Sequence, residues 1–194
     1  MKKLASTSLS ALALSALAFS AHAEPVKFAG IAFGSTVTQI ESESVQGTTK
    51  DDTDASSTYT ASFGIKDRTF RLYAEGSFEN NEVANTSMIT FNADYIYAIP
   101  AHNKASLFAG ASLGHATMQW DEDNAGVKAA GLNGETDDSF VYGAKVGAKY
   151  LVIPKAEVEL GFRQIYTSLK STEVTTSLSA EESAMTYVGV SYAF

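Results

Sequence analysis

The 194-residue sequence contains no cysteine and only three prolines and three histidines. The absence of cysteine excludes disulfide bonds, thiolate metal sites and a cysteine nucleophile. Charged residues make up 19% of the chain and aromatic residues 11%, whereas a disordered chain is rich in charge and poor in aromatic rings. After residue 23, no uncharged apolar run approaches the ~18 to 20 residues that a membrane-spanning helix needs. The composition therefore excludes a disulfide-stabilised, a disordered and a helical membrane protein.

The chain has fewer basic than acidic residues, 14 against 22, so its formal net charge is -8 and its pI is about 4.8. Binding to a nucleic-acid backbone depends on lysine and arginine, so no nucleic-acid partner is expected. The sequence has no phosphate-binding loop, no histidine-rich metal cluster and no dinucleotide fingerprint. It therefore predicts no cofactor and no defined metal site.

The first 23 residues have the organisation of an export signal. Lys2 and Lys3 precede a Leu/Ala/Ser-rich stretch from Leu4 to Phe19, and Ala21-His22-Ala23 provides the small residues of a cleavage site. This order is typical of a secretory signal peptide. We expect residues 1–23 to be removed and residues 24–194 to form one domain outside the cytoplasm.

From residue 26 onward, apolar and polar residues alternate in eight short blocks, the period of a strand with unlike faces. Within residues 58–66, the odd-numbered positions are apolar and the even-numbered ones are polar or glycine. The predicted strands occupy residues 26–38, 58–66, 70–78, 88–97, 107–114, 140–150, 157–166 and 186–194. Short turns at 66–69, 99–104 and 152–155 alternate with longer polar segments at 41–57, 79–87, 119–138 and 167–183. This alternation and the even strand number indicate an up-and-down barrel.

The composition of the polar face distinguishes between two kinds of barrel. A soluble calyx encloses its apolar face, whereas an outer-membrane barrel turns that face to lipid. Glycine recurs on the polar face here; it weakens a solvated strand but makes room inside an eight-stranded barrel. Charges enclosed together must pair, and this face carries equal numbers of both signs. The predicted lumen charge network comprises Arg71, Glu75, Asp94, Lys145, Lys149, Glu157, Glu159 and Arg163.

The apolar face carries aromatic residues near both ends of the strands, which is typical of the girdles at the two membrane–water interfaces. One group comprises Tyr59, Phe78, Phe140 and Tyr166, and the other comprises Phe70, Tyr97, Tyr150, Tyr192 and Phe194. An ordinary β-sandwich with an aromatic core is the less favoured alternative. We therefore expect an all-β, eight-stranded antiparallel up-and-down transmembrane β-barrel with short periplasmic turns and long extracellular loops.

With these features the chain resembles the small eight-stranded outer-membrane barrels, the family of the OmpA transmembrane domain, OmpX-like proteins and opacity-type adhesins. The resemblance covers residues 24–194 through architecture and is most specific in the last strand, Tyr187 to Phe194. It implies the outer membrane of a Gram-negative bacterium, contact with its lipid and lipopolysaccharide, and assembly by the barrel-assembly machinery. The implied assembly signal comprises Val188, Val190, Tyr192 and Phe194. Since the sequence stops there, no peptidoglycan-binding domain is expected.

The four longer segments contain sixteen acidic and only three basic residues. We expect them to face outward as solvated acidic loops. Two clusters in them contain oxygen ligands of the kind that calcium and magnesium prefer, although neither has the spacing of a defined calcium loop. These candidates for weak divalent-cation binding are Asp51, Asp52, Asp54, Asp121, Glu122 and Asp123.

The leading functional prediction is a non-enzymatic barrel with a plugged polar lumen. Its acidic loops would serve envelope structure or surface interaction, including adhesion, with an unidentified ligand. The alternative is a small porin-like channel for ions or solutes. A third reading is a lipid A-modifying enzyme, because His115-Ala116-Thr117 resembles the His-x-Ser pattern of lipid A deacylases, with Glu122 and Glu135 downstream. Threonine in place of serine departs from that pattern.

Overall fold

The computed structural model describes residues 24–44, 47–52, 55–80, 84–100, 102, 104–120, 136–172 and 176–194. The expected signal peptide lies outside the described residues, as do Asp54, Asp121, Glu122, Asp123 and Glu135. Asp51 and Asp52 lie in a strand, but their side chains are outside the description. Within the described ranges, no helix has the length and hydropathy needed to cross a membrane.

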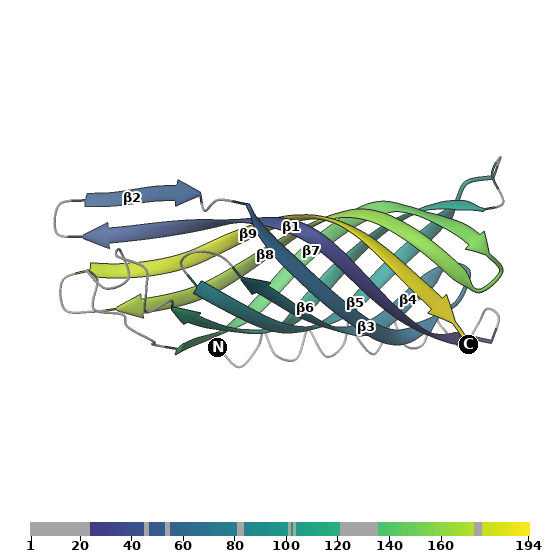
Figure 1. Cartoon of the computed structure of the whole chain (residues 1–194), viewed down its shortest axis with the longest axis horizontal. Coiled ribbons are helices and arrows are strands. Elements are labelled where there is room, and N and C mark those ends of the chain that lie inside the picture. The colour runs from purple at the N-terminus through teal and green to yellow at the C-terminus, as the bar shows by residue number, and fades with distance from the viewer. Residues whose placement is uncertain are drawn as a thin grey trace, which may run out of the picture.

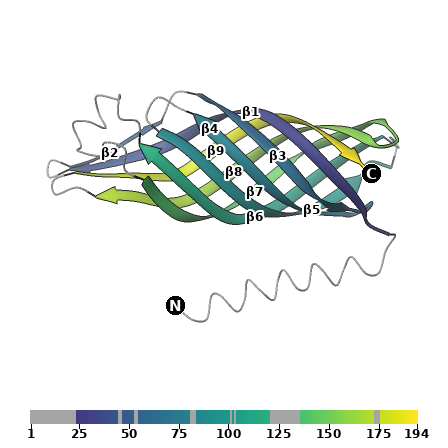
Figure 2. The same cartoon turned by 60° about the horizontal axis from the view of Figure 1, so that its bottom comes forward.

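Nine strands make up the described regular structure. They are β1 (Val26–Ser44), β2 (Gly47–Asp52), β3 (Ser56–Lys66), β4 (Phe70–Asn80), β5 (Ala84–Ala98), β6 (Ala105–Trp120), β7 (Thr136–Ile153), β8 (Ala156–Thr172) and β9 (Thr176–Ala193). From β3 to β9 each strand pairs with the next, β1 pairs with β3, and β9 returns to β1 (Figures 1 and 2). All these pairings are antiparallel. The predicted eight-stranded antiparallel barrel is confirmed, with β2 as an additional strand.

The additional strand belongs to a sheet that continues past the rest of the barrel. Residues 26–36 of β1 pair with β3, whereas residues 39–44 pair with β2. On its other side β1 remains paired with β9 as far as Ser44, opposite Thr176. The strands β2, β1, β9 and β8 therefore form what we call the extended sheet, which projects at the left of Figure 1.

The prediction of long loops is wrong in part, because β-strands occupy much of these segments. Segment 79–87 is reduced to a connection between Asn80 and Ala84, and β8 and β9 take up most of 167–183. Segment 41–57 contains the end of β1, all of β2 and the start of β3. A strand with water on both faces has no apolar side, so the period of two disappears while the backbone ladder continues. Sequence alternation therefore marks only the lipid-facing part of each strand.

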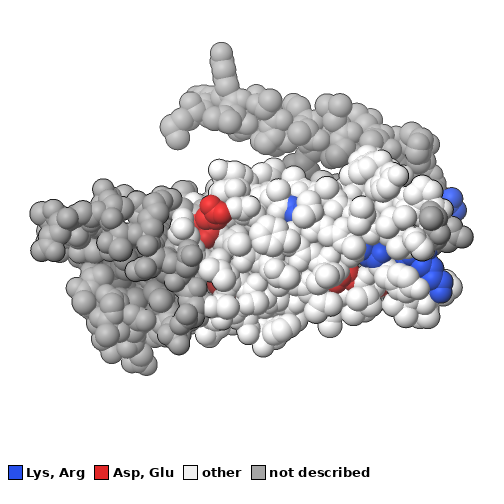
Figure 3. Space-filling view, turned by 90° about the horizontal axis from the view of Figure 1, so that it is seen from above, with Lys and Arg blue, Asp and Glu red and all other residues white. Residues whose placement is uncertain are grey.

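Apolar side chains point outward around the barrel, as the alternation predicts. In β1, Ile31 is 70% exposed while its neighbours Gly30 and Ala32 are partly covered; in β5, Phe91 is 62% exposed between buried Thr90 and Asn92. A soluble calyx would bury these large side chains. The face seen in Figure 3 is mostly uncharged, with lysine and arginine gathered at one end. This surface suits lipid.

The three short turns lie at one end of the barrel, which we call the turn end. Aromatic rings contact one another on the outer face towards both ends, as in Tyr142–Tyr166, whose ring centroids lie 5.4 Å apart, and Phe70–Tyr95, also at 5.4 Å. Close to the turn end, Phe194 lies 6.4 Å from Phe63. The residues of the predicted assembly signal all point outward: Val188, Val190, Tyr192 and Phe194. Their role in assembly stays a prediction.

Candidate functional site

The barrel interior is organised in layers that can be followed along β4. Alternate residues of a strand share a face, and the inward face of β4 carries, from the turn end outward, Arg71, Tyr73, Glu75, Ser77 and Glu79. Each of these side chains meets partners from other strands at its own level. The interior therefore consists of stacked polar layers, with a different composition at the far end.

The layer at the turn end joins two lysines to one carboxylate. Lys66 Nζ lies 2.8 Å from Glu157 Oε2, and Lys149 Nζ lies 3.1 Å from the same oxygen. The sequence analysis counted Lys66 both as the last residue of the strand at 58–66 and as the first residue of a turn; it ends β3 and is buried, so the strand assignment is confirmed. The alternation of β3 continues to its last residue, so this side chain still points inward.

The central layer is built around Arg71. Its Nε and Nη2 donate to Asp94 Oδ2 at 2.8 and 2.5 Å, and its Nη1 donates to Glu159 Oε2 at 2.6 Å. The guanidinium also lies 4.6 Å from the ring centroid of Tyr73 and 5.4 Å from that of Phe108, within the range of cation–π attraction. Arg71 is only 3% exposed. The ring centroid of Phe28 lies 5.7 Å from the guanidinium as well. Two carboxylates and three rings thus hold one cation across the lumen.

A series of hydrogen bonds between polar side chains extends from this layer. Lys145 Nζ donates to the Tyr73 hydroxyl and, at 2.8 Å, to Asn92 Oδ1, which also accepts from Ser112 Oγ at 2.6 Å. The same ammonium lies 3.7 Å from Asp94 Oδ1. The sequence analysis missed Tyr73, Asn92 and Ser112 because they carry no charge, although all three lie on the predicted polar face.

The next layer outward pairs Arg163 with Glu75 through Nη1, while Nη2 donates to Met185 Sδ at 3.2 Å. With this pair, the structure brings all eight residues of the predicted charge network into ion pairs. Within the described residues no cluster of three or more His, Asp or Glu is placed to bind a metal. The arrangement neutralises charge and fills space, so it suits closure of the lumen.

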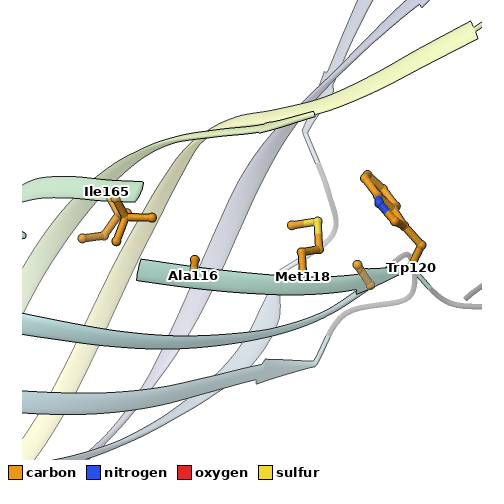
Figure 4. Packing of buried hydrophobic residues seen from close by; sticks show 6 residues of the cluster. Ala116, Met118, Trp120 and Ile165 are labelled. Carbon is orange, nitrogen blue, oxygen red and sulfur yellow. The ribbon is translucent and has the colours of Figure 1, made fainter. Parts of the chain in front are cut away.

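Beyond these layers the lumen is mixed: buried polar residues such as Thr38 and Ser56 face an apolar cluster that the sequence analysis did not predict. A buried cluster comprises Ala84, Ala116, Met118, Trp120, Val141 and Ile165. Figure 4 shows Ala116, Met118 and Trp120 on β6 and Ile165 on β8. Trp120 Nε1 donates to Asp137 Oδ2 at 3.0 Å. The predicted strand ended at residue 114, whereas β6 continues to Trp120. The sequence analysis therefore did not identify the inward-facing residues of this last part of β6.

Glu79 lies on the polar side of this end of the lumen, although the sequence analysis placed it in an outward loop. It is 8% exposed, and its Oε1 accepts hydrogen bonds from Ser56 Oγ at 2.7 Å and Thr38 Oγ1 at 3.3 Å. The correction follows from the greater length of β4, which carries the residue past the predicted strand end and onto the inward face.

His115 and Thr117 lie on the outer face of β6, beside an open depression over Gly76. Thr117 Oγ1 donates to Asp138 Oδ1 at 2.6 Å. A hydroxyl has one hydrogen to donate, and here it goes to the carboxylate.

Comparison with known proteins gives a consistent result. The family model described as "Outer membrane protein beta-barrel domain" matches residues 7–194. No curated protein matches the sequence. The structure is similar to Neisserial surface protein A, with 17% identity, a TM-score of 0.55, and coverage of 86% of this chain and 97% of the other. It is also similar to outer membrane protein H (OprH) from P. aeruginosa, solved in DHPC micelles. There the identity is 21%, the TM-score is 0.53, and the match covers 87% of this chain and 99% of the other.

At these identities the two structures are informative about fold alone, and that fold is the small closed barrel described above. The family match covers nearly the whole chain and fixes the location as the outer membrane of a Gram-negative bacterium. In that setting the turn end faces the periplasm and the extended sheet lies on the extracellular side. The chain belongs to the outer membrane protein beta-barrel domain family.

Proposed function

We propose that this protein is a non-enzymatic outer-membrane barrel with a closed lumen, which acts in envelope structure or surface interaction through its extracellular part. The observation that carries the proposal is the Arg71 layer, in which one buried guanidinium is shared by Asp94 and Glu159 and covered by aromatic rings. Opening a path through this layer would separate buried opposite charges, which is costly.

The extracellular side offers the surface for such a role. The extended sheet projects past the other strands, and the segments predicted as loops are strongly acidic even with Glu79 turned inward. Its partners would be outer-membrane lipid and lipopolysaccharide, with calcium or magnesium bridging acidic side chains to anionic lipid, and a surface ligand of unknown identity. The barrel-assembly machinery, which would insert the barrel into the membrane, is a further proposed partner.

The channel alternative makes the opposite prediction in a planar bilayer. We expect the wild-type protein to show no steady conductance, because paired charges and rings occupy the lumen. Arg163→Ala removes a cation that pairs with Glu75 and is expected to raise conductance. Arg68→Ala, in an exposed position of a short turn, is the matched control and should behave as wild type. Large, steady wild-type conductance would establish the channel in place of the closed barrel.

The surface charge predicts behaviour towards polyanions. We expect no retention on heparin at physiological salt in EDTA, since polyanion binding draws its affinity from lysine and arginine. The acidic segments offer only Lys50, Lys128 and Lys170 as cations, and like charges at an interface are repelled. Calcium or magnesium should restore any contact that depends on bridging. Tight retention in EDTA would contradict an acidic outward face.

The enzymatic alternative has less support from the described residues, which include His115 and Thr117 but not Glu122 and Glu135. The Thr117 hydroxyl is directed to Asp138, and threonine is a hindered nucleophile in place of the serine of the resembled pattern. We therefore propose that His115 and Thr117 are interface residues in the outer leaflet.

A further inference from the structure

Among the glycines whose surroundings the structure describes, Gly76 differs from all the others. A Cβ built at Gly76 meets no atom within 4 Å, whereas at every other described glycine it would lie 3.0 Å or less from a neighbouring atom. The other glycines make room for tight packing, but Gly76 faces outward on β4. Glycine weakens the interior of a strand and often marks a place where a ligand approaches the backbone closely. Packing within the barrel therefore does not account for Gly76.

Gly76 lies beneath a depression in the lipid-facing wall of the barrel. The strand register places it in one outward-facing row between Ala61 of β3 and Ile89 of β5, and both residues line the depression. Tyr59 and Phe78, in the next row toward the extracellular side, line it as well. Its volume of 490 Å³ is within the roughly 300–1,000 Å³ of ligand pockets. The depression can therefore accommodate a flexible hydrocarbon chain.

Polar side chains line the extracellular margin of this depression. His115 pairs with Ile89 and continues its row across β6. Ser87 and Thr117 lie opposite each other in the next row toward the extracellular side. Asp138 extends that row onto β7 and accepts a hydrogen bond from Thr117 Oγ1 at 2.6 Å. The depression therefore spans the boundary between the apolar belt and the polar extracellular part of the barrel.

The surroundings of the depression select a glycolipid as its occupant. The depression is continuous with the lipid-facing surface and lies toward the extracellular end of β4. Its described lining contains no lysine or arginine, the residues that recognise phosphate. The hydroxyl, imidazole and carboxylate groups at its margin can exchange hydrogen bonds with sugar hydroxyl groups.

We propose that the depression binds an acyl chain of lipopolysaccharide, with the adjoining sugar hydrogen-bonded to Ser87, Thr117 and Asp138. This site rests on the proposed function, because it specifies where on the barrel wall the lipopolysaccharide partner is held. Gly76 supplies the space for the chain, and Tyr59 and Phe78 flank it.

The test titrates purified lipid A into the folded protein in DHPC micelles. EDTA is present, so that calcium and magnesium cannot bridge lipid A to acidic side chains. The ¹³C δ1-methyl signal of Ile89 should shift and reach saturation, because Ile89 lines the depression. The signal of Ile153, which is exposed at the turn end of β7, should stay unchanged. No shift of the Ile89 signal in the wild-type protein would overturn the proposal.

Variants that fill the depression locate the bound lipid. Gly76→Phe places a ring in it and should abolish the Ile89 shift, and Ala61→Phe should do the same from β3. Ala74→Phe is the matched control, because it adds the same ring to the same face of β4 outside the lining of the depression. It should bind lipid A as the wild type does. Gel mobility before and after heating shows which variants fold, and an unchanged Ile89 shift in either folded filling variant would overturn the site.

Two comparisons test the identity of the lipid. Asp138→Ala should weaken the binding of lipid A, because it removes a carboxylate that contacts the sugar. Phosphatidylglycerol should cause a smaller Ile89 shift than lipid A, and an equal shift would overturn the glycolipid assignment. Steady wild-type conductance would disprove the closed lumen and leave these shifts unchanged, so failure of the proposed function is distinguishable from failure of this site.

Discussion

Replacing Arg71 by methionine is expected to lower the free energy of unfolding by ~3 to 5 kcal/mol, the usual cost of stranding a buried partner charge. The side chain of Asp94 is completely buried and would keep only the longer contact with Lys145, at 3.7 Å. Glu159 would lose its short bond to Nη1. Water that enters the lumen moves the expected value towards the lower bound. Methionine is chosen because it fills most of the vacated volume.

The measurement is denaturant unfolding in lipid vesicles, followed by fluorescence of Trp120, the one tryptophan of the chain. Arg68→Met removes the same charge from an exposed turn and should change stability by less than about 0.5 kcal/mol. The double variant R71M/D94N should recover part of the loss, because the stranded charge is removed as well. Equal stability of Arg71→Met and Arg68→Met would show that the central ion pairs do not hold the barrel closed.

Gly64→Ala is expected to destabilise the barrel by about 1 to 3 kcal/mol through overpacking. A Cβ at this position would lie 2.1 Å from the Leu72 carbonyl oxygen and 2.4 Å from Tyr73 Cβ. Relief would require β3 and β4 to move apart, although residues 57–66 and 71–80 are paired along their whole length. It would also displace Tyr73, which contacts both Arg71 and Lys145.

Gly76→Ala is the matched control on the outward face of β4. No atom lies within 4 Å of a Cβ built there. Alanine is favoured over glycine inside a strand by roughly 0.5 to 1 kcal/mol, so this variant should be as stable as wild type or slightly more stable. Unfolding curves of the two variants measured side by side test the difference. A Gly64→Ala protein as stable as Gly76→Ala would refute the close approach of β3 and β4.

Much of the fold is predictable because a lipid-facing barrel imposes a strict period of two. Outward positions within the membrane are mostly apolar and inward ones mostly small or paired, and β1 accordingly turns Ile31 and Phe33 outward. The charge network was predictable for the same reason, since enclosed charges must balance. Aromatic girdles mark where the lipid ends. The fold class, the orientation of the faces and the eight network residues thus follow from local pattern and elementary electrostatics.

The partners and the far end of the barrel were determined only by tertiary structure. Alternation shows that Arg71 points inward but not that Asp94 and Glu159 both reach it, because that depends on register and on strands far apart in sequence. Outside the bilayer, strands need no apolar face, so the extended sheet and the inward placement of Glu79 leave no periodic signal. The gathering of Met88, Met118 and Met185 likewise arises from barrel closure, which brings β5, β6 and β9 around one cavity.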